Sequence, residues 1–98
     1  MIRVIYTWHV PDNCLDEFTE IWREATNQIR ENIEGARGSL MLQNHSHPKK
    51  VLTIARWNAL EEWMKFWKDG RSTAMRRMHE LATRVAVDVF EEVEDRTQ

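Results

Sequence analysis

The chain has one cysteine, Cys14, no excess of charge of either sign and no long apolar run. A single cysteine excludes an intrachain disulfide and a zinc site made from several thiolates of one chain. The 14 Lys and Arg residues against 16 Asp and Glu residues argue against a general nucleic-acid-binding protein, which carries a basic excess. No apolar run approaches the ~20 residues that span a bilayer. The opening segment MIRVIYTWHV is too short and too polar for a signal peptide, so we expect a cytoplasmic protein.

Proline and glycine are also scarce, with two and three residues. There is no low-complexity segment and no stretch that reads as a linker between domains. A chain of 98 residues therefore predicts one domain, residues 1–96, with residues 97–98 as a loose tail. A domain of this length buries only about 60–68% of the surface of its unfolded chain, so a partner subunit would enlarge its core.

Apolar side chains recur with the periods of strands and helices. Alternation from Ile2 to Val10 predicts a strand, and spacings of three and four from Leu15 to Ile33 predict a helix. The other expected elements are a hairpin of strands at 39–46 and 51–57, a helix at 60–68, a further helix through 75–82 and a last strand at 84–92. For the helix ends we expect Asp12 or Asn13 and Ser72 or Thr73 as N-caps, and Gly35 or Gly38 as the C-cap of the first helix.

These elements follow the order β-α-β-β-α-β, with the second helix in two pieces, which is the order of the ferredoxin-like fold. That α+β fold packs its helices on one face of a four-stranded antiparallel sheet. We expect Val4, Tyr6, Trp8, Leu40, Leu42, Leu52, Ile54, Val85, Val87 and Val89 on one face, and Ile5, Met41, Val51, Ala55, Trp57 and Phe90 on the other. A sheet that is apolar on both faces needs a second cover, so we infer a homodimer in which two sheets pack face to face.

Three stretches carry a resemblance to a known family: VPDNCLDEFTEIW after the first strand, GARGSLMLQN before the hairpin, and VLTIARWNALEEWMKFW, where a tryptophan ends a strand before an acidic and aromatic helix. Together with DGRSTAMRRMH they resemble the antibiotic biosynthesis monooxygenase family over essentially the whole chain. The resemblance implies a dimeric α+β barrel with a pocket between the sheet and the helices of each protomer. Known activities of that family are oxidation of polycyclic phenols and quinols without a cofactor and oxidative degradation of haem, and some members have no established reaction.

Trp67 is the principal site candidate, because it matches a tryptophan that lines the pocket in actinorhodin-type and haem-degrading relatives. It shares one helix stripe with Trp63, and the same spacing is typical of a helix that faces a core. A phenol or porphyrin needs flat apolar walls and a few placed polar groups. We expect substrate-binding contributions from Trp63, Tyr6, Thr7, Arg71 and Met75.

The histidines supply the candidate proton acceptors. Oxidation without a cofactor needs a base that turns the phenol into its anion, and histidine suits that role near neutral pH. His79 and His9 are both candidates, and the sequence does not choose between them. Haem-degrading relatives place an iron-ligating histidine on the segment that carries His79, about two residues earlier, and an asparagine on the first strand, where this chain has Ile5, Tyr6 and Thr7.

Three functions therefore remain open. The preferred prediction is a homodimeric monooxygenase that oxidises a small aromatic compound without a cofactor, with Trp67, His79 and His9 as catalytic residues. The second is a haem-binding or haem-degrading protein. The third is a non-catalytic dimeric module for a small apolar ligand. Two absences favour it: the asparagine that haem-degrading relatives have on the first strand, and the asparagine that actinorhodin-type relatives have one helical turn before the tryptophan, where this chain has Trp63. We expect no metal site, because His45 and His47 have no third ligand near them in the sequence.

Overall fold

The computed structural model describes residues 1–70 and 73–97, which form one sheet and three helices. Their bounds are β1 Ile2–His9, α1 Leu15–Asn32, β2 Ala36–Gln43, β3 Lys50–Trp57, α2 Leu60–Asp69, α3 Thr73–Leu81 and β4 Thr83–Glu91. The predicted order of elements is confirmed, including the second helix in two pieces. In the part of the chain that the structure describes, no helix combines the length and apolar character needed to cross a membrane.

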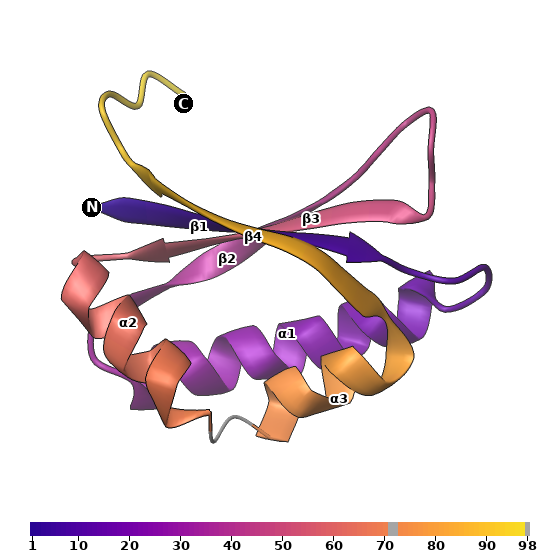
Figure 1. The fold of residues 1–98 in the computed structure, drawn as a ribbon, viewed down its shortest axis with the longest axis horizontal. Helices are drawn as coiled ribbons and strands as arrows, with labels where there is room; N and C mark the ends of the chain where they lie inside the picture. Colours follow the sequence, from indigo (N-terminus) through magenta and orange to yellow (C-terminus); the bar gives the residue numbers. More distant parts are fainter. Residues whose placement is uncertain (71–72, 98) are drawn as a thin grey trace.

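All four strands pair antiparallel in one sheet, in the order β2-β3-β1-β4. β1 and β3 therefore lie at the centre, and β4 brings the end of the chain beside its beginning. The three helices all cover the same face of this sheet, and the opposite face carries no described helix (Figure 1). This arrangement confirms the ferredoxin-like α+β fold predicted from the sequence.

The core lies between the helices and the sheet. Along β1, the even-numbered residues from Ile2 to Trp8 are buried and the residues between them are not, as the period of a half-covered strand requires. α1 contributes Phe18, Ile21 and Ala25 from one stripe. The rings of Trp8 and Phe18 meet edge to face with centroids 5.2 Å apart, a geometry that aromatic pairs prefer.

The predicted faces of β2 and β3 are wrong. Ile54 pairs with Ile5 on one side and with Leu40 on the other, and directly paired residues point to the same side of a sheet. On the face without helices, Ile5 is therefore joined by Leu40, Leu42, Leu52 and Ile54, whereas Met41, Val51, Ala55 and Trp57 lie on the helix face. Alternation within one strand groups its own residues, but only the register between strands tells which group faces the helices.

The face that the helices leave bare is nevertheless apolar, as expected. We call it the uncovered face, and its apolar members include Ile5, Leu40, Leu42, Leu52, Ile54 and Phe90. Leu40 is 51% exposed and Phe90 is 53% exposed. At one end of this face, Glu92 accepts hydrogen bonds from Arg3 at 2.9 Å and Arg56 at 3.3 Å. The hydrogen bond from Arg3 and the two positive charges lower the pKa of the Glu92 carboxyl.

The start of α1 differs from the prediction. Neither Asp12 nor Asn13 caps it, because Cys14 occupies the N-cap position and no side chain there accepts a hydrogen bond from the first turn. Asn13 has φ +64°, a left-handed conformation that asparagine tolerates. This residue therefore turns the chain into the helix instead of capping it.

The C-cap of α1 is Ile33, in an extended conformation, so the prediction of Gly35 or Gly38 at that position is wrong. Two glycines take left-handed conformations near helix ends. Gly70 has φ +62° and closes α2, as a glycine C-cap commonly does. Gly35 has φ +89° in the turn after α1, and a Cβ placed there would collide with the carboxyl group of Glu62. The N-cap predicted at Ser72 or Thr73 lies outside the side chains that the structure describes.

Candidate active site

Two adjoining hollows on the helix side of the sheet contain predicted site residues. The inner cavity, between α1, β2 and the centre of the sheet, has a volume of about 50 Å³. The outer hollow, lined by α2, α3 and the start of β4, has a volume of about 530 Å³. Phe66 and Met75 line both, so these two side chains stand between the inner cavity and the outer hollow.

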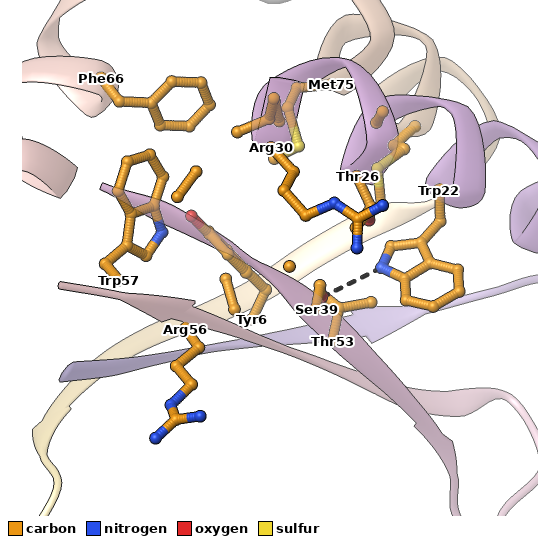
Figure 2. A pocket seen from close by; sticks show the side chains of 16 residues that line it. Tyr6, Trp22, Thr26, Arg30, Ser39, Thr53, Arg56, Trp57, Phe66 and Met75 are labelled. Carbon is orange, nitrogen blue, oxygen red and sulfur yellow. Dashed lines mark hydrogen bonds between the residues drawn. The ribbon is translucent and has the colours of Figure 1, made fainter. Parts of the chain in front are cut away.

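The inner cavity combines apolar walls with four hydroxyl groups. Trp57 and Phe66 form one wall, with ring centroids 5.3 Å apart, and Met78 and Ile29 are also part of the lining. Figure 2 shows these side chains arranged around the space between α1 and the sheet. One of them is the hydroxyl of Thr26, and the three that hydrogen-bond to indoles are those of Tyr6, Ser39 and Thr53.

Each of these hydroxyls accepts a hydrogen bond from an indole. The pairs are Trp63 Nε1 to Tyr6 Oη at 3.0 Å, Trp8 Nε1 to Thr53 Oγ1 at 3.0 Å, and Trp22 Nε1 to Ser39 Oγ at 3.2 Å. An indole nitrogen can only donate, so the hydroxyl oxygen must accept. None of the three hydroxyl protons has an acceptor among the described residues. The hydroxyl groups are therefore left to donate to whatever enters the cavity.

The charge around the inner cavity is positive. The Arg30 guanidinium lies over Ser39 at the cavity (Figure 2) and has no ion-pair partner among the described residues. Arg56 borders the cavity through its backbone and side-chain stem, but its guanidinium points away through the sheet and pairs with Glu92. Burial raises the pKa of the Tyr6 hydroxyl, which stays a neutral donor at physiological pH. No carboxylate belongs to the described lining.

Three side chains with complementary chemistry meet in the outer hollow. The guanidinium carbon of Arg84 lies 4.6 Å from the centre of the Trp67 ring, a cation–π contact. Arg84 Nη1 lies 3.3 Å from His79 Nε2. Because a guanidinium can only donate, Nε2 accepts this hydrogen bond and the imidazole is neutral.

Burial and the neighbouring Arg84 cation lower the pKa of His79 below its ordinary value of 6.5. Both effects disfavour the imidazolium form. The ring also packs against Trp8, with centroids 5.1 Å apart. His79 is therefore a neutral imidazole near pH 7, with the protonation state that a proton acceptor requires.

Trp63 contacts one lining residue of the outer hollow, Trp67, and one of the inner cavity, Tyr6. It is 8% exposed and lines neither space, but its ring packs against Trp67 with centroids 5.3 Å apart. Its Nε1 holds the Tyr6 hydroxyl, and the Tyr6 ring in turn stacks with Trp67 at 6.2 Å. A contiguous aromatic group of three rings thus connects the two spaces.

The structure brings together some of the predicted site residues and separates others. Trp67, His79 and Met75 line the outer hollow, and Tyr6 and Met75 line the inner cavity. Two others line neither space: Thr7, on the uncovered face, and His9, exposed at the end of β1. Arg71 lies outside the described residues.

His79 Nε2 accepts a hydrogen bond from Arg84, so haem iron, like any other ligand of that nitrogen, would first have to displace the guanidinium. Among the described residues, no three His, Cys, Asp or Glu side chains come together as metal ligands do.

Sequence reasoning missed four residues of the site: Arg84, Arg30, Ser39 and Thr53. A usable signal existed for the hydroxyls, because a buried indole N–H usually finds an acceptor and the chain has five tryptophans. Arg84 gave no such signal. It opens the last strand, where β4 pairs out of register with β1 between Thr7 and Trp8, and a β-bulge can redirect a side chain.

Comparisons with known proteins agree with this fold. A family model described as antibiotic biosynthesis monooxygenase matches residues 1–81. A candidate enzyme of that name from Bordetella bronchiseptica has a TM-score of 0.82 at 14% identity, over 95% of this chain and 97% of that one. A mutant of SnoaB, a cofactor-independent oxygenase from Streptomyces nogalater, has a TM-score of 0.79 at 12% identity, over 99% and 97%. No curated protein matches the chain. At these identities, the structural matches show a shared fold.

Proposed function

The chain belongs to the antibiotic biosynthesis monooxygenase family, and on that premise we propose that it is a cofactor-independent monooxygenase of a small phenol- or quinol-type compound. The observation that carries the proposal is the group of Trp67, Arg84 and neutral His79 in the outer hollow. The cofactor-independent oxygenase SnoaB, which has the same fold, supports the absence of a cofactor from the reaction.

The size of the outer hollow supports an aromatic substrate. A protein cavity of about 150 Å³ holds benzene, so the outer hollow of about 530 Å³ accommodates a substituted ring. The inner cavity of about 50 Å³ does not. The substrate ring therefore lies against Trp67, which offers a flat face beside a fixed positive charge.

The reaction balances without an external reductant. A phenol with a free ring position reacts with dioxygen to give a quinone and water. One oxygen atom forms the new bond to the ring carbon, and the other leaves as water with the two hydrogens that the substrate loses. The phenolate, not the phenol, donates the first electron to dioxygen, so the site must first remove the hydroxyl proton and then hold negative charge.

His79 and Arg84 supply these two roles. The substrate hydroxyl replaces Arg84 at His79 Nε2 and transfers its proton there, and general bases of this kind contribute about 10²–10⁴-fold to rates. The released guanidinium of Arg84 turns to the phenolate and to the reduced oxygen, where a fixed donor stabilises developing charge. Trp67 holds the ring, and Trp63 and Tyr6 hold Trp67 in position. The sequence-based alternative base, His9, does not belong to the described lining of the outer hollow.

The uncovered face supports a homodimer. Leu40 and Phe90 expose about half of their surface, and an extended apolar patch of this kind is typical of an interaction site. One row of paired residues crosses the face through Leu40, Ile54 and Ile5, and a second contains Leu42 and Leu52. The C-terminal segment and the β2–β3 loop both extend on the side of this face (Figure 1). A second copy of the sheet would therefore pack between these two segments. Analytical ultracentrifugation should show a dimer that Ile54→Asp converts to monomer, whereas a monomeric wild type contradicts the proposal.

Oxygen consumption tests the activity. Chelator-treated protein is mixed with a panel of phenols and quinols, and dioxygen uptake is recorded with an electrode. We expect His79→Ala and Arg84→Gln each to lower kcat/KM at least about tenfold, and the control His47→Ala, on the exposed hairpin, to match the wild type. Equal rates in all four proteins would refute the site.

The other two predicted functions appear as distinct outcomes. A stoichiometric Soret band on adding hemin, lost in His79→Ala, would favour the haem-binding alternative. Saturable binding of phenols with no oxygen uptake by any panel member would favour a non-catalytic binding module. The cytoplasmic location stays a prediction from the sequence.

A further inference from the structure

We infer that the inner cavity is a subsite for a carboxylate carried by the aromatic ligand. This inference deepens the proposed function and rests on it for the position of the ring in the outer hollow. The ring lies against Trp67, and its carboxylate passes between Phe66 and Met75, the two side chains that line both spaces. The unbranched methionine can adapt to such a group, since it has three rotatable bonds.

The Ser39 and Thr53 hydroxyls come from neighbouring strands at one part of the inner cavity, whereas the Tyr6 hydroxyl lies at the far end of its ring, beside Trp57 in Figure 2 and bonded to Trp63. Tyr6 and Thr53 are direct partners across β1 and β3, and Ser39 lies diagonally from Thr53 across β2 and β3. Paired side chains of this kind have Cβ atoms about 5 Å apart, and diagonal ones about 7–8 Å. Tyr6 is 5% exposed and Thr53 is 3% exposed, so water reaches neither side chain freely.

The indoles determine the direction of these hydrogen bonds. Each hydroxyl oxygen already accepts from a tryptophan, so its proton points elsewhere and finds no acceptor among the described residues. A ligand that only accepts hydrogen bonds suits the protons of Ser39 and Thr53. A carboxylate has two oxygens and about four acceptor positions, whereas an amine or ammonium group would compete with the donors already present.

Arg30 adds the charge that a carboxylate needs. Its guanidinium lies over Ser39 (Figure 2) and has no ion-pair partner among the described residues, and no carboxylate belongs to the described lining. Moving an anion out of water is costly unless it is paired and hydrogen-bonded. The Arg30 guanidinium, on an exposed side chain at the cavity, and the hydroxyl donors of Ser39 and Thr53 supply such partners, and charge-assisted hydrogen bonds are about twice as strong as neutral ones.

The size of the inner cavity limits the group to a small one. A volume of about 50 Å³ is several times the 10–15 Å³ that one water molecule needs and about a third of the 150 Å³ that holds benzene. A carboxylate fits within this range, and a second ring does not. The substrate class is therefore a phenol or quinol that carries one carboxylate.

A matched pair of ligands tests the subsite. Hydroquinone and 2,5-dihydroxybenzoate share the same quinol ring and differ only in the carboxylate. Binding is measured by isothermal titration calorimetry under nitrogen, so that neither ligand reacts. We expect the carboxylate to lower Kd about tenfold, as one charge-assisted contact of about 1.4 kcal/mol would. Arg30→Gln should reduce this preference to about twofold or less, and Arg30→Lys should retain part of it.

Arg37→Gln is the matched control. Arg37 is exposed on the same strand as Ser39 and does not line the cavity, so its loss changes the net charge equally without touching the subsite. Equal affinity of the wild type for both ligands would overturn the inference, as would an equal loss of preference in Arg37→Gln and Arg30→Gln. A carboxylate preference without turnover in air would support the subsite and refute the monooxygenase. Rapid turnover of both ligands with equal affinity would support the monooxygenase and refute the subsite.

Discussion

Replacing Tyr6 with phenylalanine tests the link between the aromatic group and the stability of the fold. The hydroxyl is the acceptor for Trp63 Nε1 at 3.0 Å, and both side chains are buried, at 5% and 8% exposure. Tyr6→Phe keeps the ring and leaves a buried N–H without a partner. Such an orphaned donor costs about 1–3 kcal/mol, and each kcal/mol corresponds to about 4–8 °C in Tm for a domain of this size.

Urea unfolding followed by far-UV circular dichroism, at one fixed protein concentration, measures this cost. The control is Trp63→Phe, alone and combined with Tyr6→Phe, because the double variant removes the donor and the acceptor together. A hydrogen-bonded pair should show a coupling energy of at least about 0.5 kcal/mol. Strict additivity of the two changes, or a Tyr6→Phe cost below about 0.3 kcal/mol, would refute the hydrogen bond as a source of stability.

Three further predictions concern His79, Arg84 and the turn glycines. The native pKa of His79 is below its ordinary 6.5, so the unfolded chain binds more protons at this residue than the native chain does. The stability that His79 contributes is therefore fully present above pH 6.5 and is lost as the pH falls through the native pKa. His79→Gln should abolish this pH dependence in urea unfolding. Arg84→Gln should raise the pKa of His79, read from the shift of its ring protons by NMR, and an unchanged value would contradict the contact. Gly35→Ala should destabilise the fold by about 1–3 kcal/mol, chiefly because φ +89° is strained for alanine, while the Glu62 carboxyl at the new Cβ is the free end of a side chain that can move aside. Gly70→Ala, with φ +62° and no atom within reach of the new Cβ, should cost about 1 kcal/mol.

The sequence was sufficient for the fold because its helices and strands have strong periods. The alternation in β1 and the three-and-four spacing in α1 both survive in the burial of these elements. The sequence was insufficient to predict the register between neighbouring strands. Leu40 and Ile54 lie opposite Ile5 because of the register of two hairpin strands, and alternation alone has no information on that register.

The site was predictable where one helix stripe carries it and unpredictable where the tertiary fold assembles it. Trp63 and Trp67 lie on one stripe, and they do pack together. Arg84 reaches Trp67 only because β4 returns beside β1, and Arg30 and Ser39 line one cavity only because α1 packs against β2. Contacts between residues so distant in the sequence follow from topology, which is fixed only after the sheet order is known.

Isotope labelling of the product under ¹⁸O₂ tests the central claim most directly. Chelator-treated protein is incubated with a phenol that it consumes, and the quinone is analysed by mass spectrometry. The proposed reaction incorporates one ¹⁸O atom per product molecule and releases the other as water, at a rate that falls in His79→Ala and Arg84→Gln and not in His47→Ala. A product without label, or a rate that follows the iron content of the preparation, would contradict cofactor-independent monooxygenation at this site.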